Sequence, residues 1–309
     1  MRNLVFISSL FIFLCIAILG FTLNNEGYID YIVYNQCLTN GTYPDIEPGF
    51  AVICQFTSQF SETTAITLAR MLSLTLFLVS FLYFYKIFGV YTAFFHIFIN
   101  GFQTLGAYRQ GTATILLCVA AAMLMKSYKL RALGTIILAM SFHYSSIFYI
   151  FALFVMKFVN RYFAIFVACG VIFSSFILLH PLTAYIIPQV VLYRYNNLLN
   201  VSLPDSNYFA LGKIWYVVYY TYFNIILWRS FDKINNIILL HFSYVLFALT
   251  LSVPILTLMG SWSATRISSM TNPLELIFFA VVASSRQRLF MLGAYVVRTS
   301  VAFINFFVV

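Results

Sequence analysis

The chain has 309 residues, of which 62% are hydrophobic and only 8% are charged. A soluble domain carries about 25% charged residues, so this chain has too few polar residues to cover a water-soluble core. The formal net charge of +9 comes largely from short joints between apolar runs, which is typical of membrane sidedness and does not indicate nucleic-acid binding.

The first predicted element is an apolar run at 4–23, long enough to cross ~30 Å of hydrocarbon. Arg2 precedes the run, and no small-x-small cleavage pattern closes it. A cleaved signal peptide is the alternative reading. We interpret the run as a first membrane helix, with Arg2 holding the N-terminus in the cytoplasm.

Further apolar runs follow, separated by short joints and by two long polar segments at 24–63 and 180–212, which we expect to be loops. No internal repeat or soluble domain interrupts them, so a single domain is predicted over 1–309. The prediction is an all-α, polytopic integral membrane protein with about 10–11 transmembrane helices. After the first run, the predicted spans are 64–85, 87–105, 111–125, 132–142, 144–156, 162–179, 213–228, 236–258, 272–285 and 289–306.

Basic residues set the predicted orientation, because Lys and Arg are retained on the cytoplasmic side. With the N-terminus inside, the cytoplasmic joints hold 11 of the 17 basic residues, and both long polar segments lie outside. A single helix over 132–156 would reduce this to 9 against 8. We therefore expect a break near His143, with two short helices that reach a thinned surface or a water-filled cavity.

The five cysteines contain no CxxC pair, so the sequence does not support a zinc or redox site. Cys37 and Cys54 share the first polar segment. They could form a disulfide if that segment faces an oxidising compartment, and two free thiols are the alternative.

Two polar residues stand where apolar or neutral residues are expected. Arg109 lies in an outer joint, where its guanidinium could clamp a phosphate or simply reach the lipid headgroups. His143 interrupts an apolar stretch, and it could carry a proton or form a buried hydrogen bond between helices.

The outer segments carry further candidates. Tyr31 and Tyr34, with Asp30 and Glu47, suit a sugar-binding surface, because aromatic rings stack on sugar faces and carboxylates accept hydroxyl protons. A solvated loop with interfacial aromatics explains them equally well. The outer arginines could gather into a cationic pocket with Arg109, although packing against a helix partner is the alternative. These arginines are Arg194, Arg266, which we place in an outer joint, and Arg298, near the middle of the last span.

These residues fall in a pattern that resembles a known family. Tyr108-Arg109-Gln110-Gly111-Thr112-Ala113 is followed some thirty positions later by Ser141-Phe142-His143-Tyr144-Ser145, as in the EpsG/Wzy-type polysaccharide polymerases. Glu47-Pro48-Gly49-Phe50 is similar to the family's glutamate-proline-glycine-aromatic element. The resemblance covers about 28–156, and beyond it only hydropathy and Arg266 agree. The chain is short for such a polymerase, and its predicted helix count is odd.

The resemblance implies a GT-C-like bundle in the bacterial inner membrane that polymerises O-antigen or capsular repeat units. Such enzymes transfer a glycan from undecaprenyl pyrophosphate to another lipid-linked repeat unit at the periplasmic face. The implied partners are these lipid-linked units, membrane lipid and a chain-length regulator, with no nucleic acid, cofactor or metal. The implied site is catalytic at His143, Glu47 and Asp30, pyrophosphate-binding at Arg109, Arg266 and Arg194, and sugar-binding at Tyr31, Tyr34, Tyr108 and Gln110.

Two other classes of function remain open from the sequence. Another membrane transferase, such as an O-acyltransferase, should place its catalytic histidine in the membrane or on the cytoplasmic side, whereas His143 is expected outside. A flippase or transporter of lipid-linked sugars should show paired halves with interrupted helices, and the sequence shows no such symmetry.

Overall fold

The computed structural model describes residues 7, 11–12, 29–41, 47–106, 108–147, 158, 160–179, 207–258 and 263–308, some of them by their backbone alone. Regular structure within these ranges is helical, and no strand occurs there, which confirms the all-α prediction. The chain divides into two compact units, one of Met1–Phe154 with Leu276–Ala283 and one of Val155–Glu275 with Ser284–Val309. The single domain stays a prediction.

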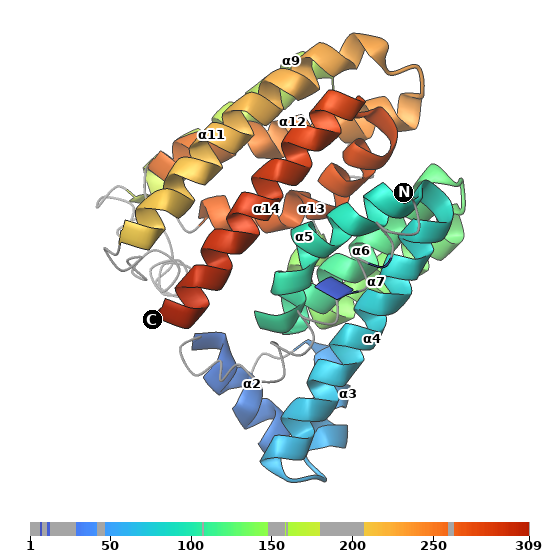
Figure 1. Ribbon diagram of the computed structural model, residues 1–309, viewed down its shortest axis with the longest axis vertical. Helices are drawn as coiled ribbons and strands as arrows, with labels where there is room; N and C mark the ends of the chain where they lie inside the picture. Colours follow the sequence, from blue (N-terminus) through green and yellow to red (C-terminus); the bar gives the residue numbers. More distant parts are fainter. Residues whose placement is uncertain are drawn as a thin grey trace. The chain divides into compact units, whose positions relative to one another are not determined.

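The first unit is built from antiparallel helices with two shorter helices at one end (Figure 1). The shorter pair, α2 and α3, lies in the predicted outer segment 24–63, where the sequence had not predicted helices. The helices of this unit are α2 (Ile29–Asn40), α3 (Pro48–Thr57), α4 (Glu62–Phe88), α5 (Val90–Gly106), α6 (Tyr108–Met125), α7 (Lys129–Phe142), the 3-10 turn η1 (Tyr144–Ser146) and the π-helix η5 (Phe278–Val282).

Local sequence explains where α4 begins and ends. Ser61 precedes the helix in an extended conformation, and Glu62 in the first turn complements the positive end of the helix dipole. Lys86 lies in the last turn, and Gly89 ends the helix with φ of +87°, a value that L side chains rarely adopt. The 27 residues between these signals extend ~40 Å.

Helices α6 and α7 pack through small side chains. Ala113, Ala120, Ala132 and Ala139 are all buried in one cluster between them. Small residues let two helix backbones approach closely. In lipid, where the hydrophobic effect does not drive helices together, this close packing stabilises their association. This close packing positions the start of α6 and the end of α7, where Arg109 and His143 lie.

A buried polar network joins α4, α5 and α6. The His96 imidazole lies within 2.9 Å of the Ser80 hydroxyl and 2.8 Å of the Asn100 amide, which also donates to the Cys118 sulfur at 3.4 Å. His96 is fully buried and packs against aromatic rings. Since both ring nitrogens have partners in this network, we assign His96 a structural role in the packing of the unit.

The second unit contains longer helices in which several predicted boundaries change. Residues 263–271, expected to form a joint, are helical, and α11 begins at Asn207, six residues before the predicted 213. Arg266 therefore lies within a helix. The helices are α9 (Arg161–Leu179), α11 (Asn207–Ser230), η4 (Phe231–Lys233), α12 (Ile237–Leu258), α13 (Ser263–Ile277) and α14 (Ser285–Val308).

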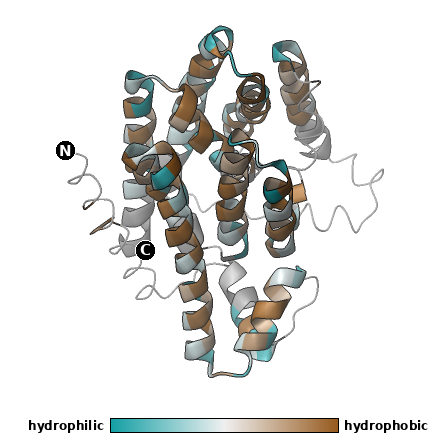
Figure 2. Cartoon of the chain, turned by 90° about the vertical axis from the view of Figure 1, so that its right-hand side faces the viewer, coloured by the Kyte–Doolittle hydropathy of each residue, from teal (hydrophilic) through white to brown (hydrophobic). Residues whose placement is uncertain are grey.

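Hydrophobic residues dominate the middle stretches of the helices, and hydrophilic residues gather at helix ends and turns (Figure 2). Among the residues that the structure describes, α4 and α12 are long and apolar enough to cross a membrane, by length and composition alone. Further apolar helices are shorter, including α3 and much of α6. The exposed large hydrophobic side chains, such as Leu130 and Phe166, leave apolar surface on both units.

Candidate active site around Glu47

Glu47 occupies the residue immediately before α3, with an extended backbone at φ −64° and ψ 142°. Pro48 follows as the first helical residue, a position that its fixed φ favours. The Glu47 side chain does not cap its own helix. The carboxylate is therefore available to groups from other elements.

Gly49 explains why a glycine follows the proline. A Cβ atom at Gly49 would lie 2.8 Å from the carbonyl oxygen of Ser141 and 3.0 Å from its carbonyl carbon, and it would also meet the Ser141 hydroxyl. The start of α3 thus lies directly against the end of α7. The two motif stretches that resembled the polymerase family are in contact at this point.

His143 ends α7, as the sequence predicted. Its backbone is extended, with φ −157° and ψ 116°, while its N–H still donates to the Ala139 carbonyl as the last bond of the helix. The short turn η1 follows. The break directs the imidazole of His143 to Glu47 from the α7 side.

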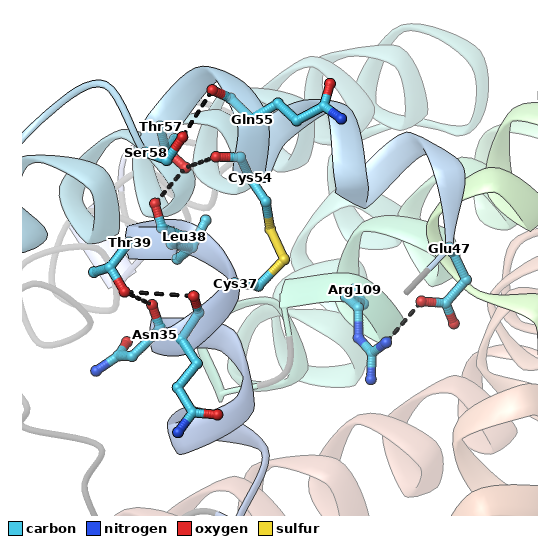
Figure 3. The surroundings of a disulfide bond; sticks show 11 residues. Asn35, Cys37, Leu38, Thr39, Glu47, Cys54, Gln55, Thr57, Ser58 and Arg109 are labelled. Carbon is cyan, nitrogen blue, oxygen red and sulfur yellow. Dashed lines mark hydrogen bonds and ion pairs between the residues drawn. A yellow bond between two sulfur atoms is a disulfide. The ribbon is translucent and has the colours of Figure 1, made fainter. Parts of the chain in front are cut away.

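The Glu47 carboxylate joins three parts of the chain. Its Oε2 accepts from Nη1 of Arg109, at the start of α6, at 2.7 Å (Figure 3). Its Oε1 lies 3.1 Å from Nδ1 of His143 and 3.4 Å from the backbone nitrogen of Tyr144. The Glu47 side chain is 5% exposed, whereas those of Arg109 and His143 are 18% and 20% exposed. The carboxylate is covered, and its two partners remain accessible.

Burial raises the pKa of the Glu47 carboxyl group, but the hydrogen bond from His143 and the charge of Arg109 lower it more. The resulting pKa lies below the ordinary 4.5. Glu47 is therefore ionised at neutral pH and is a weak base. Because a carboxylate only accepts hydrogen bonds, Nδ1 of His143 carries a hydrogen, and Nε2 keeps its lone pair in the neutral imidazole.

A disulfide anchors the second half of α3, away from the end next to Glu47. Cys37 of α2 is bonded to Cys54 of α3, so the alternative of two free thiols is wrong. Thr57 at the end of α3 donates to the Leu38 carbonyl at 3.1 Å and strengthens the same contact (Figure 3). Helix α3, which begins just after Glu47, is thus fixed at both ends.

Of the remaining predicted site residues, only Gln110 has a described side chain, half-buried in the first turn of α6. Asp30, Tyr31 and Tyr34 lie on α2, Tyr108 begins α6, and Arg266 lies on α13, but their side chains fall outside the described part. Arg194 also lies outside the described residues. The roles predicted for these residues stay predictions.

Sequence reasoning missed one cluster. Glu275 is fully buried in the second unit and accepts hydrogen bonds from Tyr219, Tyr220 and Tyr295. The available signal was the recurrence of tyrosines along α11, combined with a glutamate inside an otherwise apolar stretch. An intramembrane carboxylate is expensive unless it is paired, so this pattern predicts partners for Glu275.

Comparison with known proteins agrees with the motif contacts. A family profile described as the EpsG family matches residues 5–309. No curated protein and no solved structure matches the chain. The match includes the Glu47, Arg109 and His143 stretches and continues well beyond 28–156, where the motifs had carried the resemblance. The chain belongs to the EpsG family.

Proposed function

We propose that this protein is an oligosaccharide repeat-unit polymerase of the bacterial inner membrane, for O-antigen or capsular polysaccharide. It transfers a glycan from undecaprenyl pyrophosphate to the terminal sugar of another lipid-linked repeat unit. The strongest support is the pair of contacts at the Glu47 carboxylate. Arg109 and His143, which belong to the two other motif stretches, both contact it. No redox cofactor is needed for this transfer.

His143 is the proposed general base. Nε2 takes the proton from the acceptor hydroxyl, and the hydroxyl oxygen forms a bond to the anomeric carbon of the donor sugar. The bond between that carbon and the diphosphate oxygen breaks, and its electron pair leaves with undecaprenyl pyrophosphate. Glu47 orients the imidazole through Nδ1, as the third member of a catalytic triad does. Its lowered pKa makes Glu47 itself a poor base.

Arg109 supplies positive charge beside the base. Its Nη1 is held by Glu47, which fixes the guanidinium, and the side chain keeps part of its surface exposed. Negative charge develops on the diphosphate as it leaves, and a prepositioned cation stabilises that charge most where water is excluded. Arg109 is therefore proposed to bind the donor diphosphate.

The membrane placement is part of the proposal. The 11 of 17 basic residues in the predicted inner joints support a multi-pass topology with 24–63 and 180–212 in the periplasm. The Cys37–Cys54 disulfide supports the same side for 24–63, because disulfides persist in the periplasm and are rare in the cytosol. Glu47, Arg109 and His143 were all predicted on that face, and their mutual contacts support it.

The test is reconstitution of the purified protein in liposomes with lipid-linked repeat units. We expect a ladder of lengthened products and one undecaprenyl pyrophosphate released per linkage. Arg109→Ala should abolish the ladder and Arg109→Lys should restore little, because Lys lacks the planar fork. Arg131→Ala, in the first turn of α7, is the matched control and should retain it. Movement of the lipid-linked units across the bilayer without lengthening would instead identify a flippase and refute the proposal.

A further inference from the structure

A second cluster of charged and polar side chains lies in the second unit, and it has no role in the proposed reaction as described above. Its centre is Glu275 on α13, which is fully buried. The carboxyl oxygens accept from the hydroxyls of Tyr219 at 2.9 Å, Tyr220 at 3.0 Å, Tyr295 at 2.8 Å and Thr271 at 2.5 Å. Four donors satisfy the group. Glu275 therefore needs no ligand, and it holds the three tyrosines in place.

Arg298 lies one turn beyond Tyr295 on α14, in a cradle of rings. Its guanidinium carbon is 5.2 Å from the ring centre of Trp215, 5.4 Å from that of Tyr216 and 5.5 Å from that of Tyr295. Nη2 donates to the Tyr216 hydroxyl at 3.0 Å. The Trp215 indole is itself fixed by a 2.7 Å bond to the Ala294 carbonyl. The cradle holds the guanidinium ready to bind a ligand.

The charge of Arg298 is not neutralised by direct contact. No Asp or Glu oxygen lies within 4.0 Å of it in the described ranges, and Tyr216 accepts the one hydrogen bond it makes there. The Tyr295 hydroxyl donates to Glu275, and its ring contacts Arg298. A half-buried guanidinium that makes one hydrogen bond within the described ranges is costly in a membrane. An anion bound at Arg298 would offset this cost.

The proposed reaction requires a second anion site. Both substrates carry a diphosphate, but the acceptor reacts at a sugar remote from its own diphosphate. Arg109, beside the proposed base, serves the donor, so the acceptor diphosphate must be bound elsewhere. Tyr216 lies three residues, or ~5 Å, along α11 from the charged Lys213, in a helix that begins at Asn207. This is a depth that a lipid diphosphate can reach.

We propose that Arg298 and the Tyr216 hydroxyl bind the diphosphate of the acceptor lipid, and that Glu275 is a positioning residue that acts through Tyr295. This inference rests on the proposed polymerase function. It predicts that Arg298→Gln raises the KM for the acceptor by about tenfold to a hundredfold, as expected for the loss of a charged hydrogen-bond donor, and leaves kcat nearly unchanged. Glu275→Gln should raise the same KM less.

The direct test is native mass spectrometry of the full-length protein in nanodiscs with undecaprenyl pyrophosphate. We expect two bound diphosphates for the wild type, one for Arg298→Gln, one for Arg109→Gln and two for the control Arg288→Gln at the other end of α14. If Arg298→Gln fails to fold, Tyr216→Phe removes only a hydroxyl and should weaken one of the two sites.

The outcomes separate this inference from the proposed function. Two bound diphosphates in a folded Arg298→Gln, or wild-type affinity at both sites in Tyr216→Phe, with one bound diphosphate in Arg109→Gln, would overturn the Arg298 site and leave the polymerase proposal standing. A wild-type protein that binds none would overturn both. Displacement from the Arg298 site by phosphatidylglycerol or inorganic pyrophosphate at equal concentration would show a general anion site and also overturn the inference.

Discussion

Glu47 connects the candidate site at the scale of single residues, because its two oxygens receive donors from two different helices. Arg109 and His143 are 34 positions apart in the sequence, and each of them contacts the same carboxylate. Removal of this one charge should therefore affect both partners. Substitution of Arg109 or His143 alone leaves Glu47 with its other contact.

The pH dependence of stability follows from the lowered pKa of Glu47. A carboxyl group with a depressed pKa stabilises the fold above its unfolded value, near 4.5, and loses this contribution as the pH falls through its folded pKa. We expect Glu47→Gln to lower the Tm at pH 6–7, and the difference from wild type to shrink below about pH 4.5. The measurement is thermal unfolding in detergent from pH 3.5 to 7, with Glu62→Gln in the first turn of α4 as the control. A Tm difference that grows towards low pH would contradict the pairing.

The sequence identified much of this site because its residues were conspicuous against their surroundings. Arg109 lies on the predicted outer side, where basic residues are disfavoured, His143 interrupts an apolar stretch, and the motif spacing linked both to Glu47. The resemblance implied a catalytic role for Glu47, but the sequence did not show which groups the Glu47 carboxylate contacts. Those contacts depend on distances between helices, which hydropathy does not report.

The contact between α3 and α7 organises the site at the scale of elements. It depends on the absence of a side chain at Gly49, where a Cβ would meet the backbone of Ser141. Backbone atoms cannot move aside as a flexible side chain can. The start of α3 must therefore shift if Gly49 is replaced, and Glu47 shifts with it.

Gly49→Ala should reduce the polymerisation rate by about a hundredfold, since a displacement of ~1 Å in a catalytic group costs that much. Gly134→Ala is the matched control, because a Cβ at Gly134 on α7 meets no atom within 4 Å. The measurement is the initial rate of ladder formation at equal amounts of inserted protein. Equal rates for the two variants would show that the close approach is not needed.

The disulfide between α2 and α3 is the second prediction at this scale. Of the five cysteines, Cys37 and Cys54 are bonded to each other, so reduction of the denatured protein should expose two additional thiols to maleimide, counted by mass. The Cys37→Ser, Cys54→Ser double variant should be less stable by about 2–4 kcal/mol and should lose activity at a lower temperature. An unchanged thiol count after reduction would show that the bond is absent, and one argument for a periplasmic location would be lost.

At the scale of the whole molecule, hydropathy and the distribution of basic residues predicted the helices well but their boundaries less so. Each run from 64–85 to 132–142 coincides with a helix within a few residues, and α7 ends at the predicted break. The sequence did not predict α2 and α3, because the polar segment 24–63 shows no long apolar run. It also did not predict the extension of α13 back to Ser263, since the residues there are polar and show no apolar run either.

The orientation of the chain can be tested by labelling of single cysteines in intact cells. We expect a membrane-impermeant maleimide to react at position 205, in the predicted outer segment 180–212, and not at position 129, the first residue of α7, at its predicted cytoplasmic end. The variants Asp205→Cys and Lys129→Cys in a background without other cysteines provide the two sites. Reaction at 129 without reaction at 205 would invert the topology and place Glu47, Arg109 and His143 on the cytoplasmic face.

The role of His143 as the base, oriented by Glu47, is the central claim. Its most direct test is the rate of transfer between purified lipid-linked repeat units by His143→Gln, which keeps the side-chain size and hydrogen-bonding capacity but removes basicity. We predict a loss of roughly 10²–10⁴-fold, with donor binding retained, whereas His241→Gln on α12 keeps the wild-type rate. A His143→Gln enzyme that polymerises at nearly the wild-type rate would contradict the account.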